Sequence, residues 1–243
     1  MTQINRPHSD SAISESSIFS DEELLRAYDR ILPLADHYQS IMEVHLRELA
    51  GCDHIIDLGC GTGVPTIEFL KRGQRVTAVD ISQESLDILR AKAVAADCAD
   101  RLTVLNADIM DLSLLRDREF DGASSMIVAH LLKHPENHLR ECSRLLKING
   151  VLMMTARIAG SYPDALVEST LKSIRRREDY EDLRSDFEIV AEKLLRTAHL
   201  RSPSLMHKES CITMLRDTGF TRVMLHDNRS IGNMTTLEAL IIK

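Results

Sequence analysis

The feature that most constrains this chain is the glycine-rich segment Asp57-Leu58-Gly59-Cys60-Gly61-Thr62-Gly63. A short apolar run precedes it and apolar residues at helical spacing follow it, which is the pattern of a strand, a tight turn and a helix. Glycine adopts positive φ without strain and lets the backbone approach a ligand closely. The helix start behind the turn offers free N–H groups to a polar ligand. The sequence therefore predicts a ligand-binding turn at the end of a strand.

The alternation of strand and helix patterns continues beyond this turn. Strands that alternate with helices of about 10–15 residues form βαβ units and a parallel sheet. The predicted fold class is α/β, with a Rossmann-like, doubly wound, mostly parallel sheet of seven strands, an N-terminal helical arm and a helical cap. The strands are expected near residues 54–58, 75–79, 102–105, 120–128, 151–158, 221–226 and 237–242.

Changes in composition divide the chain into three parts. Residues 1–50 are predicted to form a disordered tail, over 1–19, followed by the helical arm, which would act as a lid. Residues 51–160 and 208–243 are expected to form the cofactor-binding core. Residues 161–207 are polar, helical in pattern and free of strand signals, so they are predicted to be a cap inserted into that core.

Composition also argues against several classes of function. The chain has no Trp, only 4% aromatic residues and a net charge of −7, which argues against stacking platforms for single-stranded nucleic acid and against phosphate-backbone binding. The five cysteines form no Cys-x-x-Cys pair, and no apolar run is long enough for a signal peptide or a membrane span. We therefore expect a cytoplasmic protein with no membrane or nucleic-acid partner.

Asp80 narrows the choice of ligand. It ends the strand after the glycine turn, 23 residues beyond Asp57, and an acid about 20 residues downstream is placed to hold both hydroxyls of a ribose. A dinucleotide turn would need a small residue where Val64 stands. Asp57 would repel a pyrophosphate, but it can accept a hydrogen bond from an ammonium. A ligand that joins an α-amino acid to a ribose is S-adenosylmethionine.

With these motifs in this order, the chain resembles the class I S-adenosylmethionine-dependent methyltransferases, and among them the small-molecule type. The resemblance covers about residues 51–160 and 208–243. It implies S-adenosyl-L-methionine as the cofactor and S-adenosyl-L-homocysteine as the product, with no metal. The segments that carry it are Ile55–Gly63, Val76–Ser82, Asn106–Ile109, Phe120–Ser125, His130–Leu132, Leu145–Leu152 and Gly219–Phe220.

The resemblance implies roles for residues around the methionine part of the cofactor. Gly59 and Gly61 would pass the backbone beneath it, while Asp57 would orient this loop or the ammonium group. Ser125, at the end of the fourth predicted strand, would lie near the same part of the cofactor.

Around the adenosine part, the resemblance implies four further contacts. Asp80 would hold the ribose hydroxyls, and Ile81 would lie against the adenine. Asp108 would meet the adenine amino group, and Ile109 would supply an adjacent backbone N–H.

The residues that would handle the methyl acceptor are less constrained. Methyl transfer from a sulfonium needs mainly positioning, and a general base only when the acceptor must lose a proton. His130 is the candidate base, and a packed or solvated loop histidine is the alternative. Arg157 ends the fifth strand, where it could bind an acceptor carboxylate or phosphate, unless it is an ordinary surface arginine. Tyr28 and Tyr38 lie in the arm, so we expect them at the acceptor pocket.

Two further histidines and one basic run are predicted to lie at the surface. His134 and His138 flank a helix start, and Pro135 makes a shared helix face for His130 and His134 improbable, which argues against a metal site. The basic run at residues 175–177 is followed at once by acids, which favours a solvated, salt-bridged helix over an RNA site.

We predict a methyltransferase that acts on a small molecule through an oxygen, nitrogen or carbon nucleophile. A protein or nucleic-acid methyltransferase is the main alternative, although Ser125–Val128 lacks the Asn/Asp-Pro-Pro-Tyr pattern that goes with base or amide nitrogens in this family. An NAD-dependent oxidoreductase and a non-catalytic cofactor-binding protein are weaker alternatives. A homodimer is a common default, and the sequence leaves the oligomeric state open.

Overall fold

The computed structural model describes residues 21–157, 163–196, 207–226 and 234–240. The tail predicted for residues 1–19 lies outside these ranges, as does the end of the last predicted strand beyond residue 240.

A single sheet organises the described residues, with strand order β3-β2-β1-β4-β5-β7-β6. Strands β1 to β5 are parallel to their neighbours, whereas β7 pairs antiparallel with both β5 and β6. The prediction of a Rossmann-like α/β fold with a parallel sheet is therefore confirmed for five strands, and the antiparallel pair extends one edge. The strands are β1 (His54–Leu58), β2 (Arg75–Asp80), β3 (Leu102–Asn106), β4 (Phe120–Met126), β5 (Leu146–Arg157), β6 (Arg222–His226) and β7 (Met234–Leu240).

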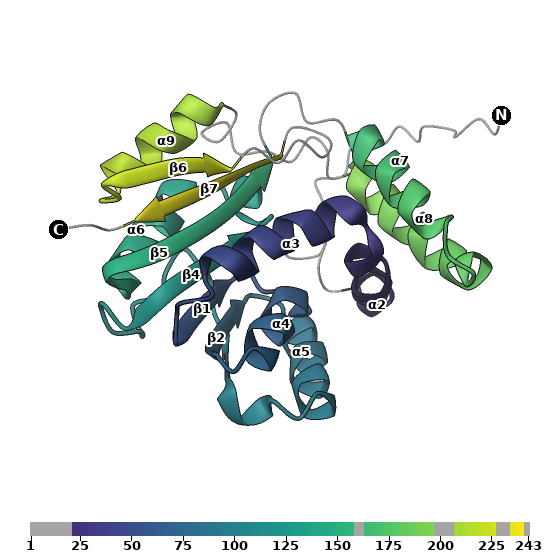
Figure 1. Cartoon of the computed structure of the whole chain (residues 1–243), viewed down its shortest axis with the longest axis horizontal. Coiled ribbons are helices and arrows are strands. Elements are labelled where there is room, and N and C mark those ends of the chain that lie inside the picture. The colour runs from purple at the N-terminus through teal and green to yellow at the C-terminus, as the bar shows by residue number, and fades with distance from the viewer. Residues whose placement is uncertain (1–20, 158–162, 197–206, 227–233, 241–243) are drawn as a thin grey trace.

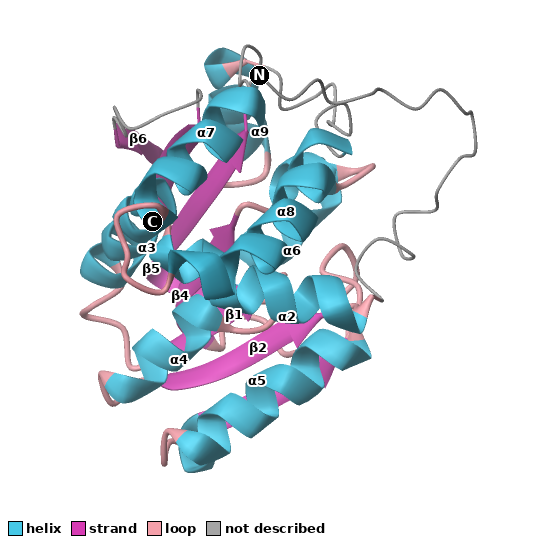
Figure 2. Ribbon diagram, turned by 90° about the vertical axis from the view of Figure 1, so that its right-hand side faces the viewer, coloured by secondary structure: helices cyan, strands magenta, loops and turns pink. Residues whose placement is uncertain are grey.

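Helices cover both faces of the sheet (Figure 1, Figure 2). One face packs against α3, α4 and α5, and the other packs against α6 and α9. The α-helices are α2 (Glu22–Ile31), α3 (Asp36–Glu48), α4 (Val64–Lys71), α5 (Gln83–Ala95), α6 (Pro135–Leu145), α7 (Pro163–Ile174), α8 (Tyr180–Arg196) and α9 (Lys208–Asp217). Short 3-10 turns are η1 (Leu32–Leu34), η2 (Ala99–Arg101) and η3 (Ala129–Leu131).

Strand β1 shows how the sequence places the two cores. Successive side chains of a strand point to opposite faces, so Ile56 and Leu58 pack with α6 and α9, whereas Ile55 packs with α3, α4 and α5. Asp57 lies on the same face as Ile55, where it is buried against α4. The strand reads as a continuous apolar run because helices cover it on both sides.

A third core lies outside the sheet, and we call α2, α7 and α8 the helical roof. Ala27 and Ile31 of α2 pack against Ile174 of α7 and against Phe187 and Val190 of α8. These helices group together at the right of Figure 1, beyond the ends of the parallel strands. The arm and part of the predicted cap thus form one unit, although more than 100 residues separate them in the sequence.

Ion pairs tie the helical roof together and to the rest of the chain. Arg30 of α2 pairs with Asp186 of α8. Arg176, just after α7, pairs with Asp36 at the start of α3 at 2.6 Å, and this hydrogen bond lowers the pKa of Asp36. Because the partners come from distant segments, these pairs fix the arm against the cap.

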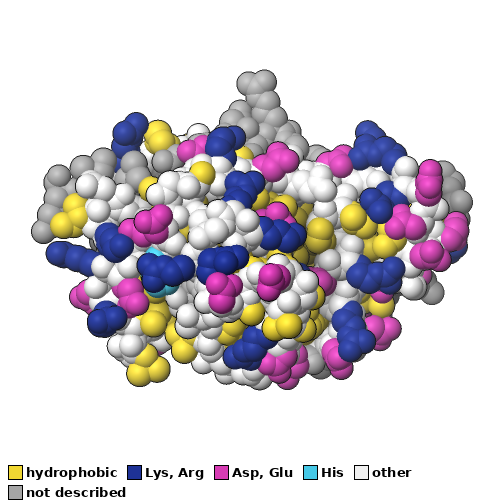
Figure 3. All heavy atoms as spheres, turned by 60° about the horizontal axis from the view of Figure 1, so that its bottom comes forward, with side chains coloured by type: hydrophobic (Ala, Val, Ile, Leu, Met, Phe, Trp, Pro, Cys, Tyr) yellow, Lys and Arg dark blue, Asp and Glu magenta, His cyan; other side chains and the backbone are white. Residues whose placement is uncertain are grey.

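The basic run at residues 175–177 does not continue a helix, contrary to the prediction. Helix α7 ends at Ile174 and α8 begins at Tyr180, so Arg177 instead pairs with Asp179 across the turn at 2.9 Å. On the face drawn in Figure 3, Lys and Arg side chains alternate with Asp and Glu side chains. That face therefore presents mixed charge and no uniformly basic stripe.

Candidate functional site

A cavity of about 620 Å³ lies where the carboxyl ends of the parallel strands meet the helical roof. The strand order reverses between β1 and β4, and open α/β sheets bind their ligands at such a switch point. Segments after β1, β2, β3 and β4 and the end of β5 line one side of the cavity. The roof and the start of α3 supply the other side through Leu25, Tyr28, His37, Tyr38, Leu166 and Leu194.

The glycine turn forms the floor of this cavity. Gly59 and Gly61 both have positive φ, at 70° and 53°. A Cβ atom on Gly59 would lie 2.7 Å from Cγ2 of Val128, so the loop after β4 closes onto the turn only because residue 59 has no side chain. The turn thus combines a left-handed backbone with a close approach, and both favour glycine.

Asp80 is held at the end of β2 by two backbone hydrogen bonds. Gly61 N donates to Oδ2 at 2.8 Å and Ser82 N donates to Oδ1 at 2.9 Å. Burial raises the pKa of Asp80, and these two hydrogen bonds oppose that rise. The carboxylate therefore joins the glycine turn to the end of β2 and faces the cavity in a fixed orientation.

Asp57 lies beneath the glycine turn with only 2% of its surface exposed. Thr66 of α4 donates its hydroxyl hydrogen to Asp57 Oδ2 at 2.5 Å. Burial raises the pKa of Asp57 to about 6, while hydrogen bonds from Thr66 and Ser124 oppose the rise. Asp57 borders the cavity and is also anchored to α4, so it can orient the loop and accept a hydrogen bond from a cation.

The expected adenosine contacts also come together at the cavity. Ile81 follows the end of β2, is 63% exposed and borders the cavity. Asp108, Ile109 and Met110 lie opposite on the loop after β3, and Met110 N donates to Asp108 Oδ1 at 2.8 Å. An exposed isoleucine and a carboxylate on the same cavity suit a flat, amine-bearing ring.

Ser125 does not reach the cavity, contrary to expectation. It is fully buried in β4, and its Oγ lies 2.9 Å from Nε2 of His138 on α6. Strand alternation gives the reason, since its neighbour Ser124 faces Asp57 and Ser125 must face the opposite side. The chain reaches the cavity one residue later, through residues 126–128.

The prediction that His138 lies at the surface is wrong, because His138 shares the buried face of α6 with Cys142, one helical turn later. The ring is fully buried between β4 and α6, with Nδ1 near the carbonyl oxygen of Ile109 at 3.4 Å. Burial lowers the pKa of His138 to about 4, so the ring is neutral at ordinary pH. Its place behind the cavity lining gives it a packing role.

The structure brings Arg157 and His130, the two residues expected to meet the acceptor, into direct contact. Arg157 is only 6% exposed, and its Nε donates to Nε2 of His130 at 2.8 Å. Both side chains line the cavity and are buried, so Arg157 is not an ordinary surface arginine and His130 is not a solvated loop histidine, whereas a packed histidine remains an alternative to a base. Because Nε2 accepts this hydrogen bond, the imidazole proton sits on Nδ1, and the lone pair that a general base would use is already engaged.

Tyr28 and Tyr38 both line the same cavity. Burial raises the pKa of Tyr28 to about 12, and the charge of Arg157 partly opposes this shift. Burial also raises the pKa of Tyr38, and nearby Asp57 adds to that rise. Tyr28 is therefore placed toward the arginine end of the cavity and Tyr38 toward the glycine turn.

His37 also lines the cavity, although no motif in the sequence points to it. The side chain is 5% exposed, its Nδ1 has no hydrogen-bond partner, and burial lowers its pKa to about 4. One signal could have revealed it, because His37 stands one helical turn before Ile41, a buried residue that packs against Leu166 of the roof. Helical periodicity places both on one face.

The charges lining the cavity are unevenly distributed. Arg157 is the one Arg or Lys among the described lining residues, and four acids line the cavity. S-adenosylmethionine carries a sulfonium and an ammonium, so an acid-rich site with an open glycine turn fits it. Among the described residues, no group of three or more His, Cys, Asp or Glu side chains is arranged to hold a metal ion. The acids are Asp57, Asp80, Glu84 and Asp108.

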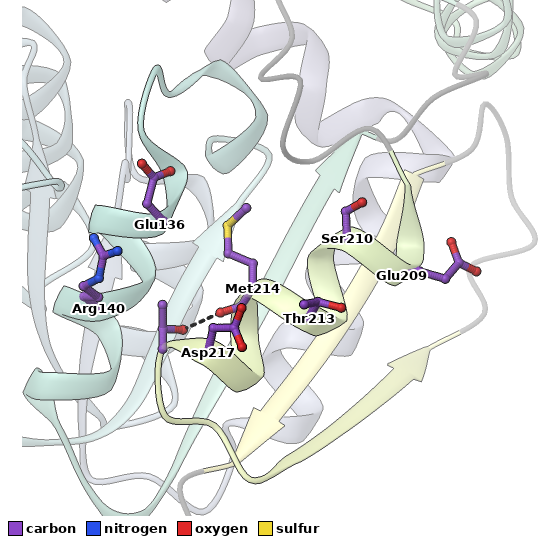
Figure 4. A pocket seen from close by; sticks show the side chains of 8 residues that line it. Glu136, Arg140, Glu209, Ser210, Thr213, Met214 and Asp217 are labelled. Atoms are coloured by element: carbon purple, nitrogen blue, oxygen red, sulfur yellow. Dashed lines mark hydrogen bonds between the residues drawn. The ribbon is translucent and has the colours of Figure 1, made fainter.

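A second hollow, of about 500 Å³, lies between α6 and α9 and shares no residue with the cavity (Figure 4). Its lining mixes charges of both signs, with Arg140 and Glu136 on α6 opposite Glu209 and Asp217 on α9. None of the predicted site residues borders this hollow, so the candidate functional site is the cavity at the strand ends.

Comparison of the sequence with known protein families agrees with this candidate site. Residues 56–154, from β1 to β5, match the family model described as "Methyltransferase domain". This part of the chain is a methyltransferase domain, and its fold is that of the class I S-adenosylmethionine-dependent methyltransferases. The matched residues include the glycine turn, Asp80 and Asp108, whereas the helical roof lies outside the match.

The relatives of this methyltransferase domain differ in what they act on. It is 35% identical over 95 residues to the ribosomal protein L11 methyltransferase of Shewanella baltica, which covers 39% of this chain and 29% of that protein. It is 28% identical over 108 residues to the ubiquinone biosynthesis O-methyltransferase of Xanthomonas oryzae, covering 44% of each. The chain thus spans less than half the length of either relative.

Solved structures extend the likeness beyond the matched domain. The CurJ carbon methyltransferase superimposes with a TM-score of 0.59 over 89% of this chain and 61% of its own, at 17% identity. At this identity the likeness shows the fold alone. None of the helices in the described ranges is both long and apolar enough to cross a membrane.

Proposed function

We propose that this chain transfers a methyl group from S-adenosylmethionine to a small-molecule acceptor. The observation that carries the proposal is that one cavity is lined both by the cofactor residues and by the helical roof. The roof packs across the strand ends through α2, α7 and α8. A site covered in this way suits a small acceptor better than a folded protein or a nucleic-acid duplex.

Different parts of the cavity would bind the cofactor and the acceptor. Asp80 would hold the ribose hydroxyls, Asp108 the adenine amino group, and the glycine turn above Asp57 the methionine part. When bound, S-adenosylmethionine supplies an electrophilic methyl group on a sulfonium. The roof residues would exclude water and hold the acceptor nucleophile in line with that methyl group, and positioning of this kind accounts for much of the catalysis of such transfers.

The identity of the acceptor atom is not given by the family. The relatives named above act on a ribosomal protein, on an oxygen in ubiquinone biosynthesis and, by the name of the solved structure, on carbon. The engaged lone pair of His130 supports an acceptor that is nucleophilic without a general base on this histidine.

Calorimetric titration with S-adenosylhomocysteine, S-adenosylmethionine and NAD tests the proposal. We expect both adenosyl ligands to bind, and Asp80→Ala to weaken S-adenosylhomocysteine by about 1.5–3 kcal/mol, the scale of a lost hydrogen bond to a charged group. The matched control is Asp87→Ala, an exposed acid on α5 that pairs with Arg90. Tight NAD binding without a response to S-adenosylhomocysteine would refute the proposal.

A further inference from the structure

The acceptor end of the cavity differs chemically from the cofactor end. Large apolar side chains make up most of its wall, from the helical roof, the η1 turn and the loop after β4. Such a wall favours an acceptor with an apolar body, because burying apolar surface is the main source of affinity in such pockets. The apolar residues are Leu25, Leu32, Leu131, Leu132, Leu166 and Leu194.

One positive charge stands within this apolar wall. Arg157 is the single Arg or Lys among the described lining residues, and an arginine side chain keeps its charge at any ordinary pH. Its Nε is bound to Nε2 of His130, which holds the plane of the guanidinium in one orientation. A fixed, buried guanidinium is the arrangement that proteins use to recognise carboxylates and other oxyanions.

Charges of opposite sign favour the cofactor and the acceptor in different parts of the cavity. The acids beside the glycine turn and at the ends of β2 and β3 suit a cationic cofactor and repel an anion. Arg157 has the opposite preference, and its charge is felt by Tyr28 of the roof. An anionic acceptor is therefore guided to the arginine end of the cavity.

From this arrangement we infer that the acceptor is a mostly apolar molecule with one anionic group, which Arg157 binds in the orientation set by His130. The inference rests on the proposed function and specifies its substrate class. Arg157 is a substrate-binding residue in this scheme, and His130 is a positioning residue that acts through it. Neither residue is required to take up a proton during the transfer.

The test uses the full chain saturated with S-adenosylhomocysteine and two matched pairs of probes. Octanoate is compared with octanamide, and 4-phenylbutanoate with 4-phenylbutanamide, by calorimetric titration. Within each pair the body is the same and only the charge differs. We expect the acid to bind at least tenfold more tightly than its amide, and octylammonium to bind more weakly than either octanoate or octanamide.

Two variants assign the preference to a residue. Arg157→Met keeps the volume of the side chain and removes its charge, so the acid should lose about 10- to 100-fold in affinity while the amide changes less than threefold. Arg90→Met, a surface arginine on α5 that pairs with Asp87, should leave the ratio unchanged. His130→Gln should weaken the acid by a smaller factor, because the guanidinium stays but loses its fixed orientation.

The outcomes separate this inference from the proposed function. If S-adenosylhomocysteine binds but neither acid binds more tightly than its amide, the acceptor class is wrong and the methyltransferase assignment stands. A preference that survives in Arg157→Met would also overturn the inference. If S-adenosylhomocysteine does not bind, both conclusions fail. The comparison of each acid with its amide uses the wild-type protein, so it tests the inference even if Arg157→Met folds poorly.

Discussion

The cofactor end and the acceptor end of the cavity are built in different ways. At the cofactor end, short contiguous segments place the side chains, and the sheet beneath them is packed by helices on both faces. At the acceptor end, residues from α2, α3, α7, α8 and β5 meet through contacts between distant parts of the chain. The roof has its own small core, separate from the two cores of the sheet.

This difference implies different consequences for substitutions in the two regions. A change beneath the glycine turn disturbs a core that the whole sheet shares, so it should lower global stability. A change in the links to the roof should loosen the roof and leave the sheet intact, because local regions can open independently of the global transition.

The largest expected effect lies under the cofactor end, at Gly63. This residue directly precedes α4 as its N-cap, with a φ of 78°, and a Cβ atom there would collide with Cδ1 of the fully buried Leu89. Gly63→Ala should therefore lower the free energy of unfolding by about 3 kcal/mol, from left-handed strain and overpacking together. Chemical denaturation measures this change.

Gly73→Ala is the matched control for this prediction. Gly73 has a similar φ of 89°, but a Cβ atom there would have no neighbouring atom within 4 Å, so the substitution should cost only about 1 kcal/mol of strain. Equal destabilisation of the two variants would contradict the prediction, because it would mean that the close contact between residue 63 and Leu89 adds nothing to the backbone strain.

The next largest effect concerns pH and the buried His138 behind the cavity. Its folded pKa is about 4 against an ordinary value of 6.5, so below about pH 6.5 the unfolded chain takes up a proton that the folded chain refuses. Lowering the pH from 8 to 5 should cost about 2 kcal/mol of stability through this group. In His138→Gln the loss of stability between pH 8 and pH 5 should be smaller by about 2 kcal/mol.

Urea denaturation of both proteins at the two pH values gives this double difference. The control is Cys142→Ala, a fully buried neighbour of His138 on α6, which should weaken the fold equally at both pH values. An identical pH dependence in wild type and His138→Gln would show that the ring is not held neutral by burial.

The smallest effect tests the link between the roof and the glycine turn. Asp29 of α2 accepts hydrogen bonds from Thr62 Oγ1 at 2.8 Å and from Lys92 Nζ at 2.5 Å. Asp29→Ala should reduce hydrogen-exchange protection of α2 amides by about two- to fivefold, since partly exposed ion pairs contribute about 0.5–1 kcal/mol. Amides of β1 should be unaffected.

Glu22→Ala serves as the control on the same helix. Glu22 pairs with Arg26 within α2 and is well exposed, so its loss should leave the attachment of the helix unchanged. Equal loss of protection in β1 and α2 after Asp29→Ala would mean that the roof and the sheet open as one unit, and the contrast between them would be lost.

The cofactor end can be predicted well from sequence because its signals are local. The glycine turn and Asp80 lie in one strand-turn-helix-strand segment, so short-range spacing is enough to place them. The expectation for Ser125 is wrong because a strand's two faces alternate, and the decisive fact is that Ser124 is the residue paired with Asp57 in the sheet.

The acceptor end can be predicted only in part. Arg157 is expected there because it ends a parallel strand, but its contact with His130 depends on the fold of the η3 turn. His37 has no motif of its own, and its burial depends on α7, whose Ser173 accepts a hydrogen bond from Asp36 N at 3.2 Å. No local pattern specifies contacts across 137 residues of sequence.

The separate core of the roof has a consequence for protein engineering. Because Ala27, Ile31, Ile174, Phe187 and Val190 pack on one another, the roof can keep its shape while two leucines that line the cavity but lie outside this core are varied, namely Leu25 and Leu166. A library confined to such leucines would explore new acceptors on a scaffold whose cofactor site is left untouched. The same division lets a change of acceptor proceed by small steps, each of which preserves a folded, cofactor-binding protein.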